Sequence, residues 1–200
     1  CKNIIFRYFK FMLKILTWNI ACLPRYMNLL RNPYRKIDEI IEKIKSTNSS
    51  IICLQEVFDF NIGKKICTLL EKDFKVYYSC NSDSRFIHKN GLIIASKYDI
   101  IETFEYDFKN KEGIESFVDK GVISILINHD FFGKTVIHNT HMQSDTYFWP
   151  YFASIKNRKK QMNELKDYLN NDQFKSMTNI LCGDMNDYHT FIDNFKNEIK

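Results

Sequence analysis

Polar residues follow short apolar runs at points of the sequence where β-strands are expected to end. Asn19 follows the first run, Glu56 the second and His141 a later one, and Asp184 with Asn186 follows the last clear run. Any one of them alone would be an ordinary turn or cap. Side chains at the strand ends of a rigid sheet are held with the accuracy that catalysis needs, so together they indicate a catalytic site.

These residue types suit metal-assisted chemistry on a phosphodiester. The negative charge of a phosphodiester repels nucleophiles, and a hard cation such as Mg²⁺ neutralises it. Mg²⁺ prefers one or two carboxylates and keeps several waters, so we expect Glu56 to be a metal ligand with Asn19 as a neutral oxygen partner. His141 and Asn186 can donate hydrogen bonds to phosphate oxygens as charge builds. Asp184 can orient the attacking water or assist proton transfer.

The elements that must position these residues can be predicted from hydrophobic periodicity. Short apolar runs predict strands at 13–19, 51–54, 75–79, 91–96, 121–128, 134–140 and 178–182. Apolar residues at every third or fourth position predict helices at 34–46, 63–71 and 153–169. This mixture is typical of the α/β class, in which helices cover the sheets. We expect one domain over residues 12–200, with residues 1–11 as an extension outside it.

Composition limits the function classes. A chain of 200 residues with 44% hydrophobic and 26% charged residues is an ordinary globular domain and not a disordered segment. The net charge of +5 suits an anionic partner, either nucleic acid or a membrane surface, without choosing between them. The apolar stretch 4–16 is too short and too charged to span a bilayer. We expect a monomer.

Six cysteines occur without a CxxC motif or a histidine spacing that suggests zinc. Cys53 and Cys182 lie inside apolar runs, where a thiol behaves as a small hydrophobic side chain. We therefore expect free thiols. Free thiols favour an intracellular setting, although they leave the compartment itself open.

Four short motifs carry a resemblance to a known superfamily. They are Thr17-Trp18-Asn19, Leu54-Gln55-Glu56-Val57, Asn139-Thr140-His141 and Gly183-Asp184-Met185-Asn186. Their order and spacing resemble the endonuclease/exonuclease/phosphatase superfamily over residues 13–187. This resemblance implies a four-layer αββα sandwich (DNase I-like) with a metal site at one end of its sheets.

Within that superfamily the chain looks most like bacterial-type neutral sphingomyelinases. The local features are Cys22-Leu23-Pro24, Val57-Phe58-Asp59, residues 91–97, 113–122 and 141–145, and Arg158 with Gln161-Met162. Glu115 falls where those enzymes place a catalytic-site Asp. The resemblance implies Mg²⁺-dependent release of a lipid headgroup. The alternatives are a DNA-directed hydrolase, either a nuclease or tyrosyl-DNA phosphodiesterase-like, and a non-catalytic fragment.

The chain departs from the family pattern after Asn186. The family carries a C-terminal Asp-His pair whose His acts as general base, and no Asp-His dipeptide follows here. His189 is interpreted as an ordinary loop residue. We therefore expect a truncated domain that lacks its C-terminal strands and is inactive as it stands.

The aromatic cluster 147–152 has several interpretations. It could pack a loop onto the sandwich, make peripheral contact with a lipid surface, hold a choline headgroup by cation–π contact, or stack bases. Its exposure would distinguish packing from binding.

Overall fold

The computed structural model describes residues 12–22, 36–79, 90–111, 120–144 and 151–186, with only the backbone described for 151–153. The helices of this part are α2 (Ile37–Ser46), α3 (Phe60–Leu70) and α4 (Tyr151–Leu169). The strands are β1 (Ile15–Cys22), β2 (Ile51–Val57), β3 (Lys75–Tyr78), β4 (Ile93–Ser96), β5 (Ile100–Asp107), β6 (Gly121–His129), β7 (Gly133–His141) and β8 (Thr178–Asp184).

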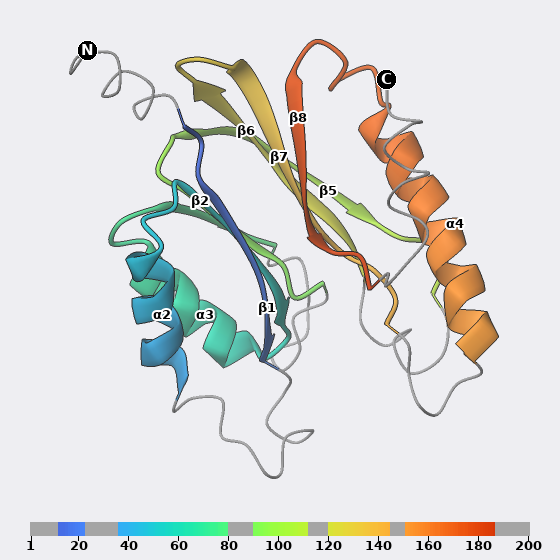
Figure 1. The fold of residues 1–200 in the computed structure, drawn as a ribbon, viewed down its shortest axis with the longest axis horizontal. Helices are drawn as coiled ribbons and strands as arrows, with labels where there is room; N and C mark the ends of the chain where they lie inside the picture. Colours follow the sequence, from blue (N-terminus) through green and yellow to red (C-terminus); the bar gives the residue numbers. More distant parts are fainter. Residues whose placement is uncertain (1–11, 23–35, 80–89, 112–119, 145–150, 187–200) are drawn as a thin grey trace, which may run out of the picture.

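The strands form two four-stranded sheets that pack face to face (Figure 1). The first has the order β1-β2-β4-β3 and the second the order β5-β6-β7-β8. Each sheet is mixed: β1 with β2 and β7 with β8 are parallel, and the remaining pairs are antiparallel. Helices α2 and α3 cover the outer face of the first sheet, and α4 covers that of the second. The layers therefore run helix, sheet, sheet, helix, within the expected α/β class.

Strand β2 contributes side chains to two hydrophobic cores, one on each face of its sheet. Successive side chains of a strand point to opposite faces. Ile52 and Leu54 pack under helices α2 and α3, while Ile51 and Cys53 face the second sheet. Both faces of β2 are covered, so its residues 51–54 are fully buried, and the sequence shows a continuous apolar run instead of an alternating pattern.

The two helices on the first sheet follow from local signals. Ile37, Ile40, Ile41 and Ile44 form the buried stripe of α2. Helix α3 begins at Phe60, three residues before the predicted start, because the Asp59 side chain caps it. The Asp59 carboxylate accepts a hydrogen bond from the Ile62 N–H at 3.0 Å, which satisfies one of the donors at a helix start.

Strand β5 was missed by the sequence prediction. It is an edge strand whose residues are mostly exposed or half-buried, and it pairs with β6 through an irregularity between Ile100 and Glu102. The charged residues Glu102 and Glu105 interrupt its apolar pattern, so no short apolar run marks it. Strand β1 also continues to Cys22, past the expected end at Asn19.

The cysteine prediction is confirmed for the described residues. Cys22, Cys53, Cys67 and Cys182 are free thiols. Cys53 and Cys182 come from opposite sheets and belong to the same apolar core. No helix in the described part of the chain has the length and apolarity needed to cross a membrane.

Candidate active site

Asn19 links the two sheets at one end of the sandwich. Its amide Nδ2 donates to Glu56 Oε1 at 2.9 Å and to Asp184 Oδ2 at 2.8 Å. Asn19 stands at the register position of Gln55 in the parallel pair of β1 and β2, which brings it beside Glu56. His141 is paired with Asp184 in the parallel pair of β7 and β8. The carboxyl ends of both parallel pairs therefore meet at the same place.

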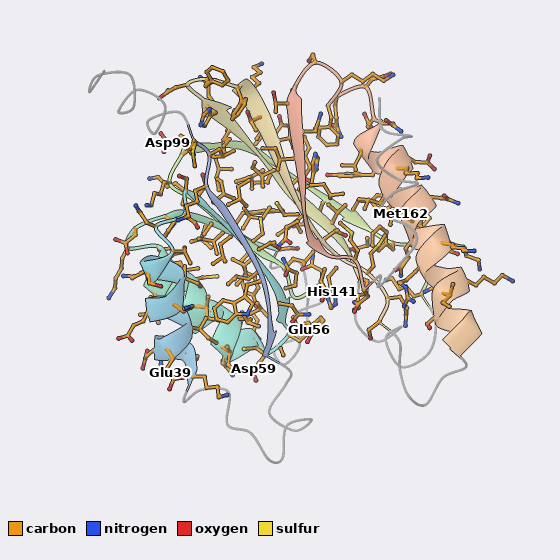
Figure 2. All side chains as sticks on the ribbon, in the orientation of Figure 1. Glu39, Glu56, Asp59, Asp99, His141 and Met162 are labelled. Carbon is orange, nitrogen blue, oxygen red and sulfur yellow. The ribbon has the colours of Figure 1, made fainter. Side chains whose placement is uncertain are left out.

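Glu56 and His141 approach each other across the two sheets. His141 Nε2 lies 3.6 Å from Glu56 Oε1. Figure 2 shows the two side chains together at the lower end of the sandwich, with Asp99 at the opposite end. The imidazole is 1% exposed. Burial and the nearby Lys120 ammonium lower the pKa of His141 to about 2, so the ring is neutral and its contact with Glu56 is not an ion pair.

Lys120 is a site residue that the sequence prediction missed. It is 2% exposed, and its Nζ lies 3.0 Å from His141 Nε2 and 3.3 Å from Nδ1. The same ammonium donates to the Met142 carbonyl at 3.0 Å. Extending the β6–β7 pairing by one residue beyond the Gly121–His141 pair places Lys120 opposite Met142, a register that only the folded sheet reveals. A buried cation is thus held against the histidine.

Asp184 ends β8, and a compact turn joins it to Asn186. Asn186 N donates to Asp184 Oδ1 at 2.9 Å, and Asn186 Nδ2 donates to the Met142 carbonyl at 2.8 Å. Met142 N donates in return to the Asp184 carbonyl at 3.0 Å. These bonds tie the end of β8 to the residue that follows His141.

Backbone conformations with positive φ occur at this end of the sandwich. Glu56 has φ 58° and Asn186 has φ 50°, values in the left-handed region that cost energy for residues other than glycine. Gly183 has φ 140°, and a Cβ there would lie 2.1 Å from the Thr140 carbonyl oxygen. The tight approach of β8 to β7 directly before Asp184 therefore requires glycine.

Five of the residues named in the sequence analysis lie together at one end of the sandwich. Asn19, Glu56, His141, Asp184 and Asn186 all lie at this end, linked by the contacts above. Three other predictions, concerning Glu115, His189 and residues 147–150, fall outside the described residues. Tyr151 and Phe152 belong to the first turn of α4, which begins two residues before the predicted start at Ala153.

The donor set can be compared with the needs of Mg²⁺. Within the described ranges, no three His, Cys, Asp or Glu side chains gather closely enough to hold a metal. Two carboxylates, Glu56 and Asp184, do converge on one amide, which fits a cation that takes one or two carboxylates plus waters. Asn19 presents its NH₂ to them, while its Oδ1 accepts from Ala21 N at 3.1 Å. Its predicted role as an oxygen ligand would require the amide group to flip, so that Oδ1 takes the place of Nδ2 beside the two carboxylates.

The chain belongs to the endonuclease/exonuclease/phosphatase family, whose sequence model matches residues 16–199. It is 24% identical over 189 residues to phospholipase C of Staphylococcus aureus, covering 87% of this chain and 57% of the relative. It is 23% identical over 192 residues to sphingomyelinase C of Bacillus cereus, covering 87% and 56%. The resemblance inferred from the four motifs is thereby confirmed.

The fold is also shared with a solved structure. A mutant of beta toxin from Staphylococcus aureus with bound magnesium ions has a TM-score of 0.78 and 20% identity, covering 91% of this chain and 67% of that chain. This likeness concerns the fold. The chain spans a little over half the length of the two sequence relatives, at 57% and 56%.

Proposed function

We propose that this chain carries the metal- and phosphate-binding part of a Mg²⁺-dependent phosphodiesterase that releases the headgroup of a sphingomyelin-like phospholipid. The observation that carries the proposal is the convergence of the Glu56 and Asp184 carboxylates on the Asn19 amide, at 2.9 and 2.8 Å. The names of the sequence relatives, a phospholipase C and a sphingomyelinase C, favour a lipid over a nucleic acid.

Each side chain has a role that follows from its surroundings. Bound Mg²⁺ would neutralise phosphate charge and polarise the phosphoryl oxygen. Glu56 supplies the carboxylate ligand, and Asn19 aligns it with Asp184. Asp184 orients the attacking water, and Asn186 donates its remaining amide hydrogen to a phosphate oxygen.

His141 and Glu115 complete the proposal. Neutral His141 donates a hydrogen bond to the phosphate, and Lys120 adds positive charge behind it. We assign Glu115 to the same catalytic site from its position in the sequence alone, within the segment that resembles the sphingomyelinases.

The experiment measures metal binding and hydrolysis separately. Mg²⁺ binding is followed by calorimetry, and hydrolysis is followed with sphingomyelin vesicles and with nicked or 5′-blocked DNA, each with Mg²⁺ and with chelator. Glu56→Gln should abolish Mg²⁺ binding and any hydrolysis. Glu39→Gln, an exposed residue of α2 far from Glu56, is the matched control and should change neither (Figure 2).

The outcomes separate the alternatives. Cleavage of DNA alone would reject the lipid substrate, and hydrolysis that is insensitive to chelator would reject the metal. Mg²⁺ binding without hydrolysis of either substrate is the result expected if the general base lies outside these 200 residues. Unchanged Mg²⁺ binding in Glu56→Gln would remove the proposed ligand.

A further inference from the structure

Helix α4 presents a row of polar side chains on a face that is largely buried. Asn157, Arg158, Gln161 and Glu164 follow one another at spacings that place them on one side of a helix. Asn157 and Gln161 are 0% exposed and Arg158 is 7% exposed. Burying polar groups is unfavourable unless they form hydrogen bonds. The hydrogen-bond partners of these side chains therefore show which parts of the chain the row holds in place.

Gln161 binds two chain segments at once. Its Oε1 accepts from the backbone N–H of Gln143 at 2.9 Å, and its Nε2 donates to the carbonyl of Asn110 at 2.8 Å. Gln143 comes two residues after the end of β7, and Asn110 comes three residues after the end of β5. One side-chain amide therefore joins the segments that leave two strands of the second sheet, with its acceptor and its donor each matched to the correct partner.

The neighbours of Gln161 in the row bind the same two segments. Asn157 Nδ2 donates to Gln143 Oε1 at 3.1 Å, and Arg158 Nη1 donates to the Gln143 carbonyl at 3.1 Å. On the other side, Glu164 accepts from the backbone N–H groups of Lys109 at 2.7 Å and Asn110 at 3.1 Å. Gln161 therefore lies in the middle of a row that holds both segments.

The held segment leads directly into the candidate active site. Gln143 follows Met142, whose carbonyl accepts from Lys120 Nζ at 3.0 Å and from Asn186 Nδ2 at 2.8 Å. A shift of Gln143 would move this carbonyl, and with it the two side chains that bond to it. Lys120 in turn contacts the His141 ring.

We propose that Gln161 is a positioning residue for this site, which fixes the His141–Gln143 segment through its two hydrogen bonds. The expected effect of Gln161 on catalysis rests on the proposed function. Its expected effect on the position of the segment does not. Gln161 acts through Gln143 and Met142, and it contacts neither the phosphate nor the metal.

The test compares two variants of α4 in the 200-residue chain by nuclear magnetic resonance. Gln161→Met keeps the length of the side chain and removes both hydrogen bonds. Leu169→Ala, two turns further along the helix, weakens the apolar packing and leaves the polar row intact. Gln161→Met should raise hydrogen exchange at the Gln143 amide by about tenfold relative to amides in the middle of β7, because one hydrogen bond is lost. It should also shift the ring resonances of His141.

Leu169→Ala should lower the melting temperature without raising hydrogen exchange at the Gln143 amide and without shifting the His141 ring resonances. If Gln161→Met does not fold, Gln161→Asn retains the amide but is one methylene too short to reach both partners, and the same two changes are expected. Unmoved His141 resonances in a folded Gln161 variant would overturn the proposal, and so would equal shifts in Leu169→Ala.

An activity measurement separates this proposal from the proposed function. Where the wild-type protein hydrolyses the phosphodiester, Gln161→Met should lower kcat and leave KM nearly unchanged, since Gln161 does not touch the substrate. A wild-type protein that does not bind Mg²⁺ would count against the proposed function, while the exchange and ring measurements would still decide the role of Gln161.

Discussion

Gln55 of one sheet donates a hydrogen bond across the interior of the sandwich to Asn139 of the other, with 2.7 Å between Nε2 and Oδ1. Asn139 Nδ2 donates in turn to the carbonyls of Leu54 at 2.9 Å and Ile93 at 3.0 Å. Gln55 immediately precedes Glu56, and Asn139 stands two residues before His141. This polar contact in the interior of the sandwich therefore helps to set the offset at which Glu56 and His141 face each other.

Asn139→Leu should destabilise the protein strongly. The change removes the Asn139 donor from the Leu54 and Ile93 carbonyls, and each buried group that loses its hydrogen bond costs about 1–3 kcal/mol. It also removes one acceptor of the Gln55 amide, which keeps Thr17 Oγ1 and the Cys53 carbonyl as acceptors. We expect the free energy of unfolding to fall by about 3 kcal/mol or more, measured by urea denaturation. Asn163→Leu, at an exposed position of α4, makes the same chemical change and should cost less than about 0.5 kcal/mol. Similar losses in both variants would contradict a role for the cross-sheet contact.

Where the wild-type protein hydrolyses the phosphodiester, Lys120→Met should reduce this hydrolysis more than it reduces stability. The variant removes the cation that lies 3.0 Å from His141 Nε2 and keeps most of the buried side-chain volume. Removing one aligned electrostatic group from an active site lowers kcat by about 100-fold. The exposed Lys134→Met is the control for charge. Equal rates in the two variants would exclude Lys120 from the site.

The protein should lose stability as the pH falls from about 6.5 towards 4, in part because of His138. Burial lowers the pKa of His138 from 6.5 to about 4, although a hydrogen bond with Asn179 opposes the shift. In the unfolded chain His138 therefore binds a proton below about pH 6.5, whereas in the folded chain it binds one only below about pH 4. The loss from His138 amounts to about 3 kcal/mol.

Urea denaturation at several pH values checks this prediction with His138→Gln as the comparison. The variant should have a shallower dependence of unfolding free energy on pH between 6.5 and 4. Part of the slope should remain, because His141 is also buried with a lowered pKa and acts with the same sign. An unchanged slope would show that His138 is protonated as easily in the folded protein as in the unfolded chain.

Gly183→Ala should be far more costly than Gly133→Ala. Both glycines have positive φ, but a Cβ at position 183 meets the Thr140 carbonyl at 2.1 Å, whereas a Cβ at position 133 meets nothing within 4 Å. The backbone cost alone is about 1–2 kcal/mol, which we expect for Gly133→Ala. Gly183→Ala should exceed it by at least about 2 kcal/mol in thermal or urea denaturation. Comparable values would show that β8 can move away from β7.

Much of the fold could be predicted because β2, β6 and β7 are marked by apolar runs. A run with both faces buried is visible without any knowledge of its partners. The edge strand β5 is not marked in this way, because charged residues occupy its exposed face. The start of α3 depended on the cap at Asp59, which a search for apolar periodicity does not detect.

The site could be predicted only as far as motifs mark it. Asn19, Glu56, His141, Asp184 and Asn186 stand at strand ends, which local sequence reveals. Lys120, Asn139 and Gln161 act through contacts with residues distant in the sequence, and each is of a type common at protein surfaces. Their burial depends on how β6, β7 and α4 pack, and this packing is a property of the assembled sheets.

The hydrogen bond between Asn19 and Asp184 joins residues 165 positions apart. During synthesis, a nascent chain that ends before β8 contains Asn19, Glu56 and His141 but no partner for the second contact of Asn19. The site can therefore close only after almost all of the described chain has left the ribosome. Contacts of such long range also form slowly, because loop closure must precede them. The two carboxylates that converge on Asn19, those of Glu56 and Asp184, thus come together only once β8 has been made.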